Sequence, residues 1–131
     1  MKSTQTQITQ GIKISVSPRF EPLHSNALDQ KFLYSYHIVI ENLSEHTVQL
    51  LRRHWYIKDA HGSVKEVEGN GVIGKQPILQ PGQLHEYSSW CPLTTPIGEM
   101  HGTYLMHRLD HEALFEVDIP AFDLVADFKL N

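Results

Sequence analysis

Residues 32–40 read Phe32-Leu33-Tyr34-Ser35-Tyr36-His37-Ile38-Val39-Ile40, with an aromatic or aliphatic side chain at every second position. A period of two is that of a β-strand, in which successive side chains point to opposite faces of the sheet. The same period recurs near the amino terminus, where Ile12, Ile14 and Val16 alternate with polar residues. Both stretches therefore predict antiparallel strands with one buried face and one face in water.

Other short strands are expected along the rest of the chain. They fall at Thr47–Ile57, Val64–Val67, His85–Leu93, Gly102–Leu109 and Ala113–Ile119, and the last two form a hairpin across Asp110-His111-Glu112. No stretch shows the 3.6-residue apolar stripe of a helix. Seven or more strands, with turns about every eight to twelve residues, predict an all-β fold: an immunoglobulin-like or fibronectin type III-like antiparallel β-sandwich. We expect one domain over residues 1–124 and a short C-terminal tail over residues 125–131.

The alternation of apolar residues changes phase within the strand predicted at Thr47–Ile57. Val48 and Leu50 place one set of side chains in the core, whereas Trp55 and Ile57 place the other set there. Because a regular strand cannot bury both sets, we expect a β-bulge or a strong twist near Leu51–Arg53.

Composition narrows the class of protein. Eleven basic and fifteen acidic residues give a net charge of -4, which argues against a general nucleic-acid or anionic-membrane binder. Residues 1–10 are polar and unlike a signal peptide, and no apolar run is long enough to span a membrane, so we expect a cytoplasmic protein. Cys91 is the single cysteine; it forms no intramolecular disulfide and is expected to be buried and structural.

A glycine-rich segment, Gly69-Asn70-Gly71-Val72-Ile73-Gly74, matches the dinucleotide-binding pattern G-x-G-x-x-G. That pattern requires a helix after the last glycine, but Pro77 follows three residues later and biases Gln76 away from helical angles. Two interpretations remain open. Gly69, Gly71 and Gly74 either present backbone amides to a phosphate or simply allow the chain to turn between strands.

Several linked motifs together resemble the ApaG family, and they cover nearly the whole chain from Gly11 to Leu124. The motifs are Val48-Gln49-Leu50-Leu51-Arg52-Arg53-His54-Trp55, Asp59-Ala60-x-Gly62, Glu66-Val67-x-Gly69-x-Gly71-Val72-x-Gly74-x-Gln76-Pro77, Pro81-Gly82, Thr95-Pro96-x-Gly98-x-Met100-x-Gly102-x-Tyr104 and Ile119-Pro120-x-Phe122-x-Leu124. The resemblance implies a bacterial protein with a fibronectin type III-like sandwich. It also implies an association with cobalt resistance and magnesium efflux, reflected in the alternative name CorD. Two positions depart from the family pattern: Trp90 and His111 stand where glycine is expected or commoner.

Arg52, Arg53 and His54 are candidate binding residues, because two guanidinium groups and an imidazole can grip a phosphate or an acidic partner. On a regular strand Arg52 and Arg53 point to opposite faces, so only one of them can join a given site. The other arginine is expected to pack the aliphatic part of its side chain on the sheet or to pair with Glu66 or Glu68.

Neither a metal site nor a catalytic site is predicted. Nine histidines are present, but His101 and His107 are about 20 Å apart along one strand, and no compact cluster of three or four ligands stands out. His107 and His111 would meet only if the geometry of the hairpin allowed it. No nucleophile has an evident base beside it and no carboxylate pair suggests acid–base chemistry. We therefore expect no enzymatic activity and no cofactor.

The leading functional hypothesis is a non-catalytic protein-interaction module with an unidentified protein partner. Trp90, Trp55 and Tyr87 would anchor a partner if exposed, although Trp55 is expected in the core. Edge strands also allow a homodimer. The alternative is a small-ligand binder that takes a nucleotide or polyphosphate, with or without bound magnesium, through the glycine segment and Arg52 or Arg53.

Overall fold

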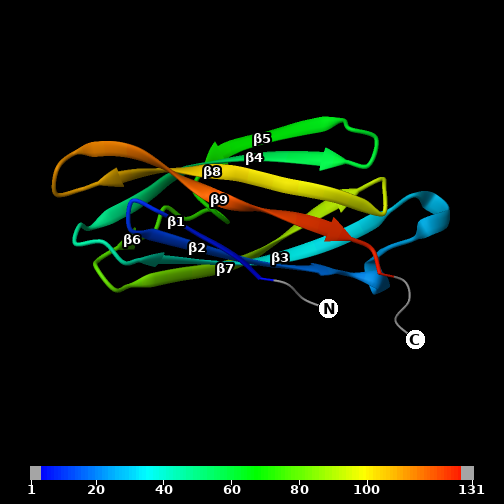
Figure 1. The fold of residues 1–131 in the computed structure, drawn as a ribbon, viewed down its shortest axis with the longest axis horizontal. Helices are drawn as coiled ribbons and strands as arrows, with labels where there is room; N and C mark the ends of the chain where they lie inside the picture. Colours follow the sequence, from blue (N-terminus) through cyan, green and yellow to red (C-terminus); the bar gives the residue numbers. More distant parts are fainter. Residues whose placement is uncertain (1–3, 128–131) are drawn as a thin grey trace.

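Two antiparallel sheets lie face to face in the computed structural model, which describes residues 4–127 (Figure 1). The first sheet has the order β1-β2-β3-β7, formed by Gln5–Thr9, Ile12–Phe20, Phe32–Asn42 and Leu84–Leu93. The second has the order β5-β4-β8-β9, formed by Val64–Asn70, Val48–Asp59, Ile97–Arg108 and Ala113–Val125, and β6 (Ile78–Leu79) pairs with β4. Two short 3-10 helices, η1 (Pro22–His24) and η2 (Ala27–Asp29), connect β2 to β3. The predicted all-β sandwich is confirmed.

The alternation along β3 produces the core as predicted. All six residues at even positions from Phe32 to Asn42 are buried, and the five between them are partly exposed. Inward side chains of the second sheet meet them across the sandwich. Tyr36 of β3, Trp55 of β4 and Phe122 of β9 pack with ring centroids 5.3 to 6.0 Å apart. Such tilted and edge-on aromatic contacts bind the two sheets together.

The predicted bulge in β4 is present. The register of β4 against β8 shifts between Leu50 and Arg52. Val48 and Leu50 before the shift and Trp55 after it are therefore all buried. The same shift turns Arg53 to the face that carries Trp55, two residues further along the strand.

β9 is longer than the sequence predicts. The strand continues through Pro120 to Val125, and Leu124 is fully buried. A second register shift, between Met100 and Gly102 of β8, places Pro120 in an irregular part of the pairing where its missing amide proton is tolerated. The strand thus ends one residue past the predicted domain boundary; of the predicted tail, residues 128–131 lie outside the described residues.

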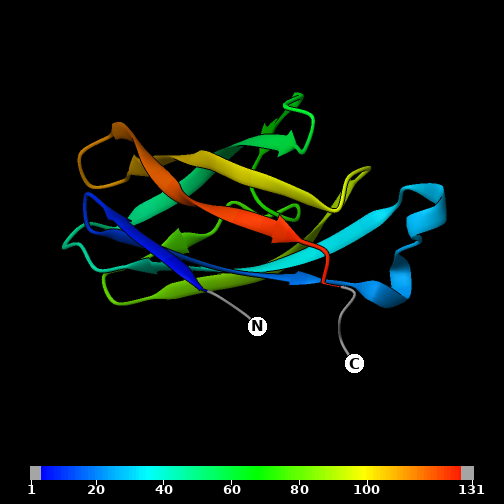
Figure 2. The same cartoon turned by 45° about the vertical axis from the view of Figure 1, so that its right-hand side comes forward.

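The two long sides of the sandwich differ (Figures 1 and 2). On one side β1 lies against β9, where the amide of Asp118 donates to Thr9 Oγ1 at 3.2 Å. On the other side are β5 and β7, the edge strands of the two sheets. Among residues 4–127 we find no helix of the length and apolar character that crossing a membrane requires.

Candidate functional site

A cleft of about 430 Å³ opens on the β5/β7 side of the sandwich. Residues 63–67 of β5 and its preceding turn form one wall, and residues 89–93 of β7 form the other. Trp55 and Met100 contribute apolar surface to its interior. A second hollow of about 250 Å³ shares Tyr36, Arg53, Trp55 and Ser89 with the first and extends to the glycine segment. This cleft could not be predicted from the sequence, because its walls belong to edge strands of different sheets.

Arg53 lines both hollows and braces the glycine segment. Its Nη1 donates to the carbonyl oxygens of Asn70 and Gly71, at 3.0 Å each. Gly69 lies opposite Arg53 in the β4–β5 register, and a Cβ at this glycine would come within 2.8 Å of the guanidinium. Gly69 therefore leaves the space across which the Arg53 side chain extends.

The prediction that Arg52 and Arg53 use opposite faces agrees with their positions. Arg52 is exposed on the outer face, where its Nη1 donates to Asn70 Oδ1 at 2.7 Å. The predicted arginine–glutamate pairs do not form in the described structure. It is His54 that contacts the two carboxylates, at 2.8 Å from Nε2 to Glu66 and 3.6 Å from Nδ1 to Glu68.

The glycine segment forms a tight turn and does not begin a helix, as expected from the position of Pro77. Val72 and Lys75 exchange backbone hydrogen bonds of 2.8 and 3.0 Å around Ile73 and Gly74, whose φ values are 47° and 72°. Positive φ at both central residues is the signature of a type I′ turn. The amide of Gly71 donates to Leu51 O at 2.8 Å. The amides of Gly71, Val72 and Lys75 are therefore used within the protein and are not available to a phosphate.

Trp90 is exposed, whereas the other two candidate anchors are not. Its side chain lies on the outer face of β7 at the rim of the cleft, with 53% of the residue accessible, and meets the His24 ring edge-on at 5.8 Å. Trp55 is buried, as expected. Tyr87 turns inward, and its hydroxyl pairs with that of Tyr104 across the sandwich. Of these three aromatic residues, Trp90 is therefore the one that a partner can reach.

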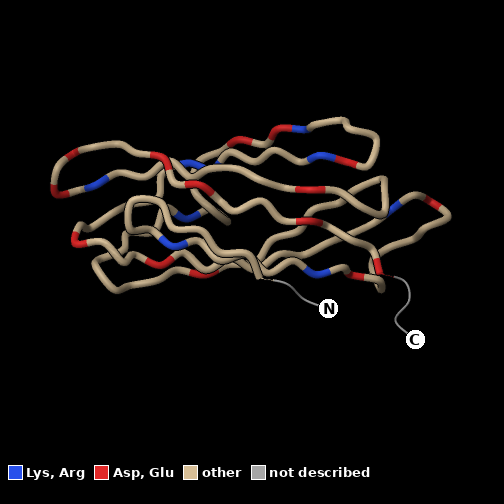
Figure 3. The backbone as a smooth tube through the Cα atoms, in the orientation of Figure 1, with Lys and Arg blue, Asp and Glu red and all other residues tan. Residues whose placement is uncertain are grey.

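The charges near the cleft differ from those of the whole chain. Lys and Arg are spread along the chain rather than gathered on one face (Figure 3), and the net charge is -4. The cleft is nevertheless lined by Arg53 and Lys65, with Asp59 as its acidic member. An anionic group entering the cleft meets two cations and one carboxylate.

Cys91 also lines the cleft but is 2% exposed. Burial raises the pKa of its thiol to about 11, with Lys65 acting weakly in the opposite direction. A thiol is a nucleophile only as the thiolate, so Cys91 is chemically quiet at neutral pH. This agrees with its predicted structural role.

A ring stack on the outer face of the second sheet was not predicted. His54 stacks on Tyr56 at 4.5 Å with an interplanar angle of 16°, and Tyr56 stacks on His101 at 4.9 Å and 11°. His54 and Tyr56 alternate along β4, and His101 faces Tyr56 in the register of β8. The pairing of β4 with β8 is not encoded locally, so the sequence alone could not reveal this stack.

Two antiparallel sheets with a cleft between their edge strands define an immunoglobulin-like β-sandwich domain. The ApaG domain model matches residues 22–108, and the chain belongs to the ApaG domain family. Protein ApaG of Brucella abortus is 47% identical over 117 residues, covering 89% of both chains. Protein ApaG of Rhodospirillum centenum is 46% identical over 119 residues, covering 91% of both.

A solved structure supports the same assignment. The crystal structure of an ApaA protein from Bordetella pertussis superposes with a TM-score of 0.86 at 42% identity, covering 89% of this chain and 94% of that one. The family name and the fold carry no indication of catalytic activity.

Proposed function

We propose that this domain is a non-catalytic protein-interaction module that acts in the cytoplasm and binds an extended segment of a partner protein in the cleft between β5 and β7. The observation that carries the proposal is the cleft of about 430 Å³ between two strand edges, with half-exposed Trp90 at its rim. Large aromatic side chains at the margin of a preformed pocket are the usual anchors of protein interfaces.

The edge of β7 supplies the main-chain part of this binding mode. Within residues 4–127, β7 pairs with β3 only, so its other edge has backbone groups available for an added strand. Side chains of an added strand alternate between the two faces of the sheet. One set would enter the cleft over Trp55, and the other would lie on the outer face beside Trp90.

Charge in the cleft selects among possible segments. Arg53 and Lys65 favour a carboxylate at an inward position, and the apolar surface of Trp55 and Val67 favours an apolar side chain at the next inward position. The proposed ligand is therefore an extended peptide with acidic and apolar residues two positions apart. Any link to cobalt resistance and magnesium efflux would then act through the partner protein.

The hydrogen bonds of Arg52 and Arg53 limit the donors that a nucleotide could use. Its guanidinium already donates to two carbonyl oxygens of the glycine segment, and Arg52 is occupied by Asn70. A polyphosphate could use only the N–H groups of Arg52 and Arg53 that these contacts leave free. Nucleotide or polyphosphate binding remains the alternative that the experiment below distinguishes.

The test is a selection of random peptides displayed on phage against the full chain, followed by fluorescence anisotropy of the enriched peptides. We expect enrichment of the apolar-x-acidic pattern, and Trp90→Ala should weaken binding by at least about tenfold, as is typical of an aromatic anchor. Leu114→Ala is the matched control, because Leu114 is also a large exposed apolar residue, at 62%, but lies on β9.

Two outcomes would overturn the proposal. One is an equal loss of peptide binding in the Trp90 and Leu114 variants. The other is a saturable rise in thermal midpoint with a nucleotide or polyphosphate that is lost in Arg53→Ala, which would establish the ligand-binding alternative.

A homodimer formed through the β7 edge would appear as a mass that depends on protein concentration in sedimentation. Competition with the selected peptide would then identify a second copy of the chain as the partner.

A further inference from the structure

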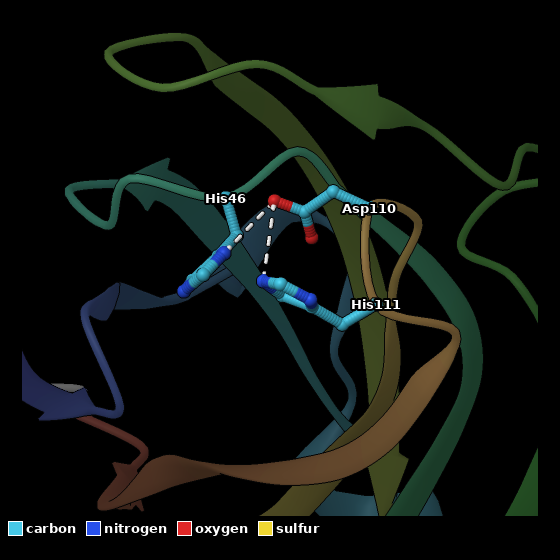
Figure 4. A group of neighbouring side chains, drawn as sticks. All are labelled: His46, Asp110 and His111. Carbon is cyan, nitrogen blue, oxygen red and sulfur yellow. Dashed lines mark hydrogen bonds and ion pairs between the residues drawn. The ribbon is translucent and has the colours of Figure 1, made fainter.

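Two imidazoles and a carboxylate meet at one end of the sandwich, where the β3–β4 connection lies beside the β8–β9 turn (Figures 1 and 4). His46 Nδ1 lies 2.9 Å from Asp110 Oδ2, and His111 Nε2 lies 4.0 Å from the same oxygen. The two histidine rings are edge-on with centroids 4.9 Å apart. One donor atom from each residue lies within 4.8 Å of the others.

This donor set has the chemistry of a transition-metal site. Two imidazole nitrogens and one carboxylate oxygen are ligands that Zn²⁺ binds at about 2.0–2.2 Å, and tetrahedral bonds of that length place the donors about 3.3 Å apart. The widest donor separation in the cluster therefore has to close by no more than about 1.5 Å. The His111 side chain can make this movement, because it is 62% exposed and lies in a turn.

The backbone around His46 is already fixed. Buried Asn42 donates through Nδ2 to His46 O at 2.7 Å, and the amide of His46 donates to Ser44 Oγ at 3.2 Å. The amide of Leu109 donates to Thr47 O at 2.9 Å and so ties the β8–β9 turn to the β3–β4 connection. A metal ion bound here would pay little to order the backbone, since both segments are already held together.

A second group of possible ligands, His54, Glu66 and Glu68, meets the same 4.8 Å limit, but its ion pairs use both nitrogens of one ring. His54 also has two carboxylates beside it, but Glu66 contacts Nε2 and Glu68 contacts Nδ1, on different edges of one imidazole ring. An ion on one nitrogen is directed away from the carboxylate that contacts the other. This arrangement orients the His54 ring, which makes the group a weaker match for one shared ion than the cluster at His46.

We propose that His46, Asp110 and His111 bind one transition-metal dication, of which Zn²⁺ is the best chemical match. The site uses His46 Nδ1, His111 Nε2 and a carboxylate oxygen of Asp110, and it keeps a fourth position for water or an external ligand. It replaces the expectation from sequence that no metal ligands converge.

The experiment is calorimetric titration of the chelator-treated full chain with Zn²⁺, paired with Co²⁺ titration followed by visible absorption. We expect one equivalent of Zn²⁺ per chain and Co²⁺ ligand-field bands that Zn²⁺ displaces. His46→Gln and His111→Gln should each weaken Zn²⁺ binding by at least about tenfold, because even the loss of an outer partner of a metal ligand costs 10- to 100-fold. His54→Gln is the matched control and should leave the titration unchanged.

Folding of each variant is checked by its thermal midpoint without metal. Should His46→Gln be unstable, exposed His111→Gln still provides the test. Weak uptake of several equivalents that is unchanged in both cluster variants would overturn the proposal. Equal weakening by His54→Gln would also overturn it, since binding would then reflect the number of histidines and not this site.

Discussion

Replacing buried Asn42 by alanine should cost about 3 kcal/mol of unfolding free energy. Asn42 is fully buried and makes four hydrogen bonds. Its Nδ2 donates to His46 O at 2.7 Å and to Leu79 O at 3.0 Å, and its Oδ1 accepts from the amide and hydroxyl of Ser44 at 2.9 and 2.6 Å. Ser44 can turn to water, but the buried carbonyl group of Leu79 loses a donor that water cannot replace. A buried polar group left without its partner costs about 1–3 kcal/mol, and the lost bonds at His46 and Ser44 contribute the rest.

Equilibrium urea unfolding measures this loss. With a slope of about 2 kcal/mol per molar, 3 kcal/mol moves the midpoint down by about 1.5 M. Asn26→Ala is the matched control. The Asn26 side chain caps η2 and makes three hydrogen bonds, but it is exposed. Water replaces those bonds, so we expect a loss of no more than about 1 kcal/mol. Equal losses in the two variants would refute the argument that burial sets the cost.

Three other predictions concern residues of β7 and β8. Gly102→Ala should destabilise the domain by at least about 3 kcal/mol in urea unfolding, because its Cβ would clash with the His54 carbonyl oxygen and force β8 away from β4. A loss under about 1 kcal/mol would contradict this. Burial raises the pKa of the Cys91 thiol to about 11, so at neutral pH Cys91 should react with a thiol reagent only as fast as the domain opens. A reaction rate equal to that of an unfolded peptide would be inconsistent with this burial. Burial, and after it Lys75, lowers the pKa of His85 in the folded domain. The unfolded chain therefore binds more protons, and the stability falls as the pH drops through the unfolded pKa of about 6.5. His85→Gln should reduce this fall between about pH 7 and 5, and an unchanged slope of stability against pH would exclude His85 as its source.

Local patterns in the sequence predict most of the fold, and the exceptions have identifiable causes. The alternation at residues 32–40 defines β3, and the phase change after Leu50 locates the bulge in β4. β1 was missed because Ile8 is its one aliphatic residue and is itself exposed. That strand is held by pairing to β2 and by cross-strand contacts such as Thr6 Oγ1 to Ser15 Oγ at 3.2 Å, neither of which leaves a periodic signal.

The candidate sites depend on long-range pairing and were correspondingly harder to predict. The opposite orientations of Arg52 and Arg53 follow from strand geometry alone. The cleft does not, because its walls on β5 and β7 belong to different sheets. His46 and Asp110 are 64 positions apart and meet only because the β8–β9 turn folds back over the β3–β4 connection.

The contact between β1 and β9 bears on how the chain reaches its native state. The hydrogen bond from the Asp118 amide to Thr9 Oγ1 spans 109 positions, so that side of the sandwich cannot close until nearly all of the chain has left the ribosome. Until then, the edge of β8 lacks its pairing partner, and the apolar inner face of β2 lacks the cover that β9 supplies through Phe115, Val117 and Ile119. Nascent chains that end before β9 are therefore expected to depend on chaperones, and completion of the last strand is the step that releases them.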